Sequence, residues 1–248
     1  MTTLVRRFVR SATPAGALAA LFALGAAGRT PRTTSGAPHT MPAAQTAKQP
    51  PVEGAVVWNI DNLQSIAGHK LTVLGAPKVI DSPGGKAVQF DGNGDAIFLD
   101  ASPLEGWKAF TWEVVFRPDA NGLAEQRFFH IQQADSANRV MFETRLRGEK
   151  WFLDTFIKSG RSERALGTDE FLHPVGRWYH AALVCDGRQM SHYVNGVKEL
   201  GGPVAFSPMG KAQVSIGCRI NKVCWFKGAV RLARFTPRVL KGEEFLKP

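Results

Sequence analysis

The stretch Phe110–Arg117, FTWEVVFR, decides the fold class of this 248-residue chain. Successive side chains of an extended strand point to opposite faces. One face of this stretch is therefore wholly apolar and is formed by Phe110, Trp112, Val114 and Phe116. A period of two with aromatic and β-branched residues is typical of a strand that packs one face on a core.

Short apolar segments of this kind recur through the chain, and none of the longer stretches has a helical period. Turn residues separate them, as at Asp91–Gly94 (DGNG), Asp186-Gly187 and Asn195-Gly196. Glycine and asparagine tolerate the positive φ angles that tight hairpins need. Many short strands with such turns predict an all-β, two-sheet antiparallel sandwich. The other expected strands are 56–59, 87–90, 96–99, 127–132, 139–145, 151–157, 178–185, 190–194, 214–217 and 229–235.

The first 53 residues are expected to lie outside this domain. Residues 1–28 carry arginines at the start and then a small-residue apolar run, Ala15–Ala27, which together indicate a cleaved signal peptide. The run is too short to span a bilayer comfortably, so we expect no retained membrane span. Residues 29–53 are rich in Thr, Pro and Ala and predict a disordered linker. We therefore expect a secreted or periplasmic protein with one domain at 54–248.

The net charge of +10 is concentrated at the N-terminus. Residues 1–55 hold six of the 31 Lys and Arg and one of the 21 acids, which leaves only +5 on the remainder. This mild excess favours anionic partners such as an acidic polysaccharide. With export predicted as well, we expect no nucleic-acid partner.

Several motifs resemble one known family. Ala87–Gly92 (AVQFDG), Phe110–Pro118 (FTWEVVFRP), Trp178–Gly187 (WYHAALVCDG) and Tyr193–Gly196 (YVNG) are similar, in order and spacing, to the LamG-like jelly-roll family, a concanavalin A-like lectin/glucanase group. The resemblance covers about residues 55–248. It implies two antiparallel sheets packed face to face. This fold hosts lectins, adhesion modules, glycanases and lyases, so it does not name a reaction.

Candidate ligand-binding residues cluster in two segments. Arg139, Glu143 and Arg145 share one face of a predicted strand, and residues 219–227 crowd polar and aromatic groups together. Sugars are bound by stacking aromatic rings and planar hydrogen-bond donors, and arginine suits acidic sugars. The candidate set is Arg139, Glu143, Arg145, His192, Arg219, Asn221, Trp225 and Lys227. The alternative is that these residues form an ordinary solvent-exposed sheet face, on which charged side chains pair across neighbouring strands.

Two further sites are considered. Asp91 and Asp95 flank a glycine turn and offer oxygen ligands for a structural calcium ion. The alternative is that these carboxylates only cap the turn. Arg231 and Leu232 stand where the family usually has an Asp-Glu pair, which weakens the case for carrying the family's calcium chemistry over to this chain. Cys218 and Cys224 are expected to form a disulfide, which export would permit.

Three functions remain open at this point. The leading hypothesis is a secreted module that binds carbohydrate, with acidic glycans favoured, or that mediates adhesion. The second is a polysaccharide lyase or hydrolase acting on an acidic glycan, for which we assign no catalytic residue because no suitably spaced carboxylate pair stands on one strand. The third is an envelope protein-interaction domain. Oligomeric state cannot be read from the pattern.

Overall fold

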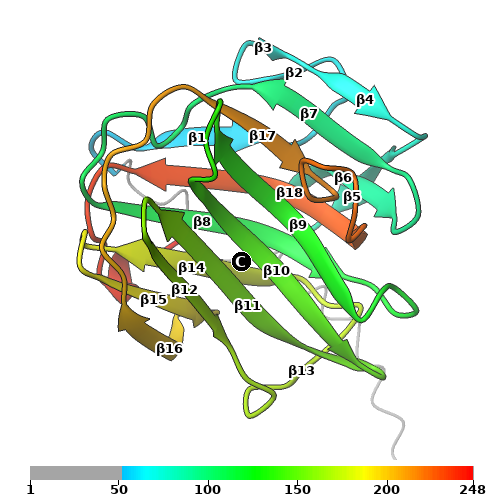
Figure 1. Ribbon diagram of the computed structural model, residues 1–248. Helices are drawn as coiled ribbons and strands as arrows, with labels where there is room; N and C mark the ends of the chain where they lie inside the picture. The colour runs from blue at the N-terminus through cyan, green and yellow to red at the C-terminus, as the bar shows by residue number, and fades with distance from the viewer. Residues whose placement is uncertain (1–51, 248) are drawn as a thin grey trace, which may run out of the picture. The chain divides into compact units, whose positions relative to one another are not determined.

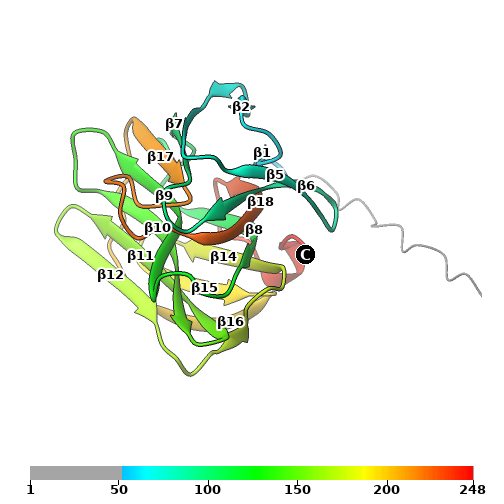
Figure 2. The same cartoon turned by 90° about the vertical axis from the view of Figure 1, so that its right-hand side faces the viewer.

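The computed structural model describes residues 52–247, which form a β-sandwich (Figures 1 and 2). Sheet I runs in the order β16 (Val197–Pro203), β15 (Gln189–Val194), β14 (Tyr179–Cys185), β8 (Phe110–Pro118), β18 (Lys227–Thr236), β6 (Gly85–Asp91) and β5 (Lys78–Ser82), with β1 (Val56–Asn59) also paired to β18.

Sheet II covers the other side of the core. Its order is β12 (Ser162–Gly167), β11 (Lys150–Ser159), β10 (Arg139–Arg147), β9 (Glu125–Gln133), β17 (Ala212–Ile216), β7 (Ala96–Asp100) and β4 (Thr72–Leu74), with β13 (His173–Pro174) beside β11. A small hairpin joins β2 (Ser65–Ile66) and β3 (His69–Lys70), and a short 3-10 turn, η1 (Gly242–Glu244), lies near the C-terminus. All pairs of strands are antiparallel, as in β8 with β14 and β10 with β11, so the predicted fold class is confirmed.

Aromatic rings fill the space between the sheets. The Trp112 ring of β8 lies 4.6 Å from the Phe142 ring of β10 and 5.1 Å from the Phe129 ring of β9, centroid to centroid. All three side chains are fully buried. Large aromatic side chains contribute most of the apolar area that such a core removes from water. The apolar face predicted for Phe110–Arg117 is thus the core face of sheet I.

A β-bulge in β9 sets which residues of that strand face outward. The register with β10 shifts between Phe142, which pairs with Phe129, and Glu143, which pairs with Arg127. The skipped residue, Phe128, is fully buried with its neighbour Phe129. A bulge adds one residue to a strand and changes the direction of the side chains next to it. Here it keeps Arg127 on the outer face.

The C-terminal segment after β18 covers the outer face of sheet I. Phe245 and Leu240 pack on Ala182 and Val184 of β14. Beneath this segment, Glu113 accepts hydrogen bonds from Arg234 at 2.6 Å and from the Leu246 N–H at 2.8 Å. His180 lies 2.9 Å from the same carboxylate, so it has the structural role that its apolar strand neighbours indicate.

The predicted signal peptide, 1–28, and all but the end of the predicted linker, 29–53, lie outside the described residues. Within 52–247 there is no helix long and apolar enough to cross a membrane.

Candidate ligand-binding face

Charged side chains from three neighbouring strands meet on the outer face of sheet II. The register pairs Glu143 of β10 directly with Asp154 of β11 on one side and with Arg127 of β9 on the other. Directly opposed residues on one sheet face are close enough to interact. We call this region the polar face; its residues are Glu125, Arg127, His130, Arg139, Glu143, Arg145, Arg147, Phe152, Asp154 and Arg219.

Arg145 is the centre of an ion-pair network on the polar face. Its Nη2 lies 2.7 Å from Asp154 Oδ2 and 3.1 Å from Glu143 Oε2, and its Nη1 lies 2.5 Å from Glu125 Oε2. Arg127 joins the network through contacts of 3.0 Å to Glu143 and 3.2 Å to Glu125. Both guanidinium groups are therefore fixed in position by these contacts.

The carboxyl groups of this network differ in exposure. Glu143 and Asp154 have side chains that are 3% and 11% exposed, whereas that of Glu125 is 61% exposed. Burial, together with the nearby charge of Asp154, raises the pKa of Glu143 to about 7 despite its two arginine partners. Burial likewise raises the pKa of Asp154, while hydrogen bonds from Arg145 and Arg127 lower the pKa of Glu125. Glu125 is thus the ionised, accessible carboxylate of the network.

The loop between β17 and β18 lies against the polar face. Its Cys224 carbonyl accepts the Arg127 N–H at 2.9 Å, and its Ile220 N–H donates to His130 Nδ1 at 3.1 Å. Burial and the charges of Arg219, Arg139 and Arg127 lower the pKa of His130 to about 3. His130 is therefore a neutral acceptor that holds the loop, and the loop brings Arg219 to this face.

A hollow of about 360 Å³ opens beside the network. It is lined by Glu125, Arg145, Arg147, Phe152, Asp154 and Gly167, among others. The Arg147 guanidinium lies 5.4 Å from the centre of the Phe152 ring. Nearby, Arg139 lies over the Phe156 ring at 4.7 Å. Gly167 faces Asp154, and a Cβ there would come within 3.0 Å of the Asp154 carboxyl carbon, so a side chain would narrow the hollow.

The structure brings together part of the predicted ligand-binding set. Arg139, Glu143 and Arg145 share the outer face of β10, and Arg219 reaches the same region from the loop. Asn221 and Trp225 belong to that loop, where Asn221 is exposed and Trp225 is partly buried.

His192 was wrongly grouped with these residues, because it lies inside the sandwich. It is fully buried, and its Nδ1 lies 3.0 Å from Thr155 Oγ1 of the opposite sheet. Its strand neighbours on the same face, Met190 and Val194, are also buried. Burial lowers the pKa of His192 to about 4, so it is a neutral core residue.

Lys227 also lies elsewhere. It stands at the start of β18 opposite Asp91 and lines a small hollow with Asp91, Asp95 and Asp119. It therefore lies apart from the arginines of the polar face, because β18 belongs to sheet I, and its role in binding a ligand stays a prediction.

The carboxylates of Asp91 and Asp95 are engaged by backbone groups. Asp95 accepts the N–H groups of Ala76 at 2.7 Å and Asp91 at 3.1 Å, and Asp91 accepts that of Asn93 at 2.7 Å. These contacts fit a capped turn. The described residues contain no cluster of three or more His, Cys, Asp or Glu arranged to hold a metal ion. Calcium at Asp91 and Asp95 stays a prediction that these contacts do not favour.

The expected Cys218–Cys224 disulfide is absent from the structure, in which Cys185, Cys218 and Cys224 are all free. Cys218 is buried, and its thiol donates to the Arg219 carbonyl at 3.1 Å. Cys224 is partly exposed and has a left-handed backbone with φ of 57°. Short spacing in sequence does not by itself give the geometry of a bridge.

Asp154, Arg127 and Glu125 were missed as members of the site. A signal for Asp154 exists in the sequence, because a two-residue turn at Gly148-Glu149 pairs Arg147 with Lys150 and therefore Glu143 with Asp154. Arg127 has no such signal, since its orientation depends on the bulge.

Comparisons with known proteins agree with the fold. A laminin G family model, described as "Concanavalin A-like lectin/glucanases superfamily", matches residues 91–245. No curated protein is similar enough to the sequence to count as a match.

Solved structures show the same architecture at low identity. Domain 4 of AbnA, a GH43 extracellular arabinanase from Geobacillus stearothermophilus in complex with arabinotriose, is 20% identical with a TM-score of 0.58; the match covers 76% of this chain and 94% of that one. The botulinum neurotoxin serotype D binding domain is 10% identical, with a TM-score of 0.56 over 77% of this chain and 50% of that one. The botulinum neurotoxin DC binding domain in complex with SialylT is 9% identical, with a TM-score of 0.55 over 77% and 49%. The chain thus spans about half the length of the two toxin domains.

Proposed function

The chain belongs to the concanavalin A-like lectin/glucanase superfamily, and on that premise we propose that it is a secreted module that binds an acidic carbohydrate on its polar face. One observation carries the proposal. Two guanidinium groups, those of Arg127 and Arg145, are held in place by buried acids and are closed on the solvent side by the exposed carboxylate of Glu125.

Glu125 occupies the position that a sugar carboxylate would take. Arginine binds carboxylates through planar, paired hydrogen bonds, and an arginine fixed in advance loses less entropy on binding. An exposed carboxylate contributes little to stability because water competes for it. A uronic acid can therefore replace Glu125, while Arg147 and Phe152 contact the sugar ring in the adjoining hollow.

The structural neighbours support the class of ligand. The AbnA domain was solved with arabinotriose, and the DC toxin domain with SialylT. At 20% and 9% identity they support a sugar partner for this fold and do not locate the site on this chain.

Removing Glu125 should strengthen acidic-sugar binding. Titration calorimetry of the full chain with tri-galacturonate should show that Glu125→Gln binds about threefold to tenfold more tightly, because the internal competitor is gone. Arg147→Gln should weaken binding by a similar factor, and it leaves the ion-pair network intact. Asp81→Asn, at an exposed acid of β5 in sheet I, is the matched control and should bind as the wild type does.

Two results would overturn the proposal. One is an absence of tri-galacturonate binding by the wild type. The other is a loss of affinity in Glu125→Gln, which would mean that Glu125 holds the site together instead of competing with the ligand.

The neighbouring carboxyl groups of Glu143 and Asp154 are the observation that supports the alternative function, a polysaccharide hydrolase or lyase. Glu143 and Asp154 are direct cross-strand neighbours, and both have a raised pKa, which is a property of catalytic acids. Both, however, are bonded to Arg145, and the Glu143 side chain is only 3% exposed, so a substrate oxygen has little access to it. Incubation with polygalacturonate should therefore give neither new reducing ends nor an unsaturated product that absorbs ultraviolet light. Either product, lost in Glu143→Gln, would establish a polysaccharide hydrolase or lyase instead.

A further inference from the structure

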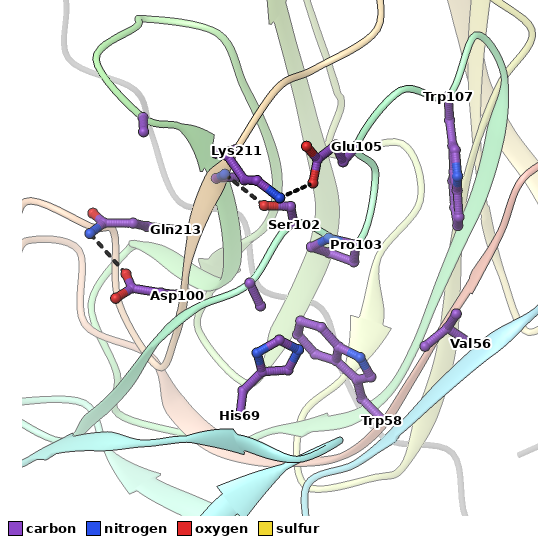
Figure 3. Close-up of a pocket in the computed structure, with 13 residues that line it drawn as sticks. Val56, Trp58, His69, Asp100, Ser102, Pro103, Glu105, Trp107, Lys211 and Gln213 are labelled. Carbon is purple, nitrogen blue, oxygen red and sulfur yellow. Dashed lines mark hydrogen bonds and ion pairs between the residues drawn. The ribbon is translucent and has the colours of Figure 1, made fainter.

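A second and larger hollow lies at one end of the sandwich and shares no lining residue with the hollow beside the ion-pair network. Figure 3 shows the residues that line it. Its volume of about 610 Å³ is within the range of small-molecule sites. Its walls come from β1, β3, the end of β7, the start of β17 and the loop that follows β7. We call it the end hollow; none of the residues predicted from sequence to bind a ligand lines it.

Aromatic rings form one side of the end hollow. Trp58 is 2% exposed and serves as a floor, with the exposed His69 ring 6.2 Å away, centroid to centroid. Trp107 is partly buried and packs against the core by one side. Figure 3 shows the Trp58 and His69 rings next to each other and the Trp107 ring apart from them. A partly exposed tryptophan next to a cavity is a surface on which the apolar face of a sugar ring can stack.

Polar groups stand opposite these rings and are already arranged in pairs. Gln213 donates to Asp100 Oδ1 at 3.0 Å, and Lys211 donates to Glu105 Oε2 at 3.0 Å (Figure 3). In these two hydrogen bonds, Asp100 and Glu105 each use one of their two carboxylate oxygens. The second oxygens of Asp100 and Glu105 therefore remain as acceptors for hydroxyl groups.

The charge of the end hollow selects against an anion. Asp100 and Glu105 outnumber Lys211, and Lys211 is already paired with Glu105. A uronic acid would meet the carboxylate of Asp100, whose partner Gln213 is uncharged, whereas neutral hydroxyl groups donate to it. The ligand preference is thus the opposite of that on the polar face.

The end hollow continues beyond a single sugar. A neighbouring hollow of about 350 Å³ shares Asp100 and Gln213 with it and runs onto the outer side of β7, where Phe98 stands. The hydrogen-bonded Asp100–Gln213 pair therefore lies where the two spaces meet. Lys70 and Lys222 also line this neighbouring hollow, so the selection against an anion applies to the end hollow alone. An extended ligand with repeating hydroxyl groups matches this shape better than a compact one.

We propose that the end hollow binds a neutral oligosaccharide, with Trp107 stacking on one sugar ring and Asp100 and Gln213 bonding the hydroxyl groups of the next. This site is separate from the acidic-sugar site of the polar face and does not depend on it.

The test is titration calorimetry of the full chain with three neutral trisaccharides: cellotriose, mannotriose and arabinotriose. At least one should bind. Asp100→Asn, which keeps the shape of the side chain, should weaken that binding about tenfold, because hydrogen bonds to a charged acceptor are lost. Trp107→Phe, which retains most of the packing against the core, should weaken it about threefold. Trp178→Phe, a partly buried tryptophan outside the end hollow, is the matched control and should leave binding unchanged.

Binding by none of the three trisaccharides overturns the inference, and so does wild-type affinity in both Asp100→Asn and Trp107→Phe. Saturating tri-galacturonate should leave neutral binding unchanged, and competition between the two would refute separate sites. Neutral binding without tri-galacturonate binding would overturn only the proposed acidic-sugar function.

Discussion

Glu143 couples the ionisation of the polar face to the stability of the domain. Its pKa is raised from 4.5 to about 7, so the folded chain holds a proton that the unfolded chain has already released in this interval. Stability therefore falls as the pH rises from about 4.5 to 7, and this loss is complete above pH 7. A shift of this size corresponds to roughly 3 kcal/mol.

Replacing this carboxyl with an amide should remove the part of the pH dependence that Glu143 contributes. Urea unfolding of Glu143→Gln and of the wild type at several pH values should show the variant gaining relative stability, by roughly 3 kcal/mol, as the pH rises through that window. Glu163→Gln, at an exposed position, should track the wild type. A constant difference between Glu143→Gln and wild type across the window would show that Glu143 stays ionised in the folded state.

The three thiols should differ sharply in reactivity. Burial raises the pKa of Cys185 to about 11 and that of Cys218 to about 12, so neither forms the reactive thiolate near neutral pH. Cys224 is the partly exposed one. Iodoacetamide labelling of the native protein, read by peptide mass spectrometry, should modify Cys224 first. Equal labelling of Cys218 would show that the loop opens, and an unlabelled, linked Cys218–Cys224 peptide would restore the disulfide prediction.

At single positions, sequence reasoning succeeded where the alternation is regular. It placed Arg139, Glu143 and Arg145 on one face because β10 alternates without interruption. It placed His192 wrongly although the face that His192 shares with Met190 and Val194 is apolar, which indicates the core. Arg127 could not be placed, because strict alternation from His130 puts it on the inner face and the bulge between them turns it outward.

Among the elements, the C-terminal segment has the clearest energetic role. Phe245 is 1% exposed and lies 5.0 Å from the Tyr193 ring and 5.6 Å from the His180 ring, centroid to centroid. Phe245→Ala should lower the free energy of unfolding by about 3 kcal/mol, as is usual for a buried aromatic side chain. Val239→Ala, an exposed position in the same segment, should change it by less than about 0.5 kcal/mol. Equal effects on chemical unfolding would show that this segment is not docked.

The strands that the sequence pattern did not predict lie mainly at the edges of the sheets. β5 and β16 end sheet I, and β4 and β12 end sheet II. Edge strands face water and carry Lys, Gly and Pro, which protect them from pairing with other chains. They therefore lack the apolar period by which the central strands were recognised. The remaining missed strands, β2, β3 and β13, have two residues each and are too short to show a period.

For the whole molecule, the sandwich was predictable because each central strand repeats the same alternation, and the family resemblance implied two antiparallel sheets packed face to face. The proposed binding surfaces could not be predicted in this way, because hollows form where strands that are distant in sequence meet. The end hollow joins residues of β1 and β17, which are separated by most of the domain.

Export is the prediction that belongs to the whole chain. Expressed in a secreting bacterial host, the protein should be recovered outside the cytoplasm without its first 28 or so residues, as the length of a typical signal peptide suggests. N-terminal sequencing of the recovered protein checks this. A full-length product confined to the cytoplasm would refute both the signal peptide and the secreted role.

The bulge in β9 makes the interior and the surface of this domain depend on each other. The Phe128 ring, which the bulge turns inward, stacks on Phe116 of the opposite sheet at 4.1 Å, and the next residue back is Arg127. A substitution as mild as Phe128→Leu would loosen that stack and let the strand straighten, so that a guanidinium group would shift without any solvent-facing residue having been altered. If the polar face binds sugar as proposed, selection for a new ligand acts through hydrophobic positions as well, and variants with an intact outer surface differ in what they bind.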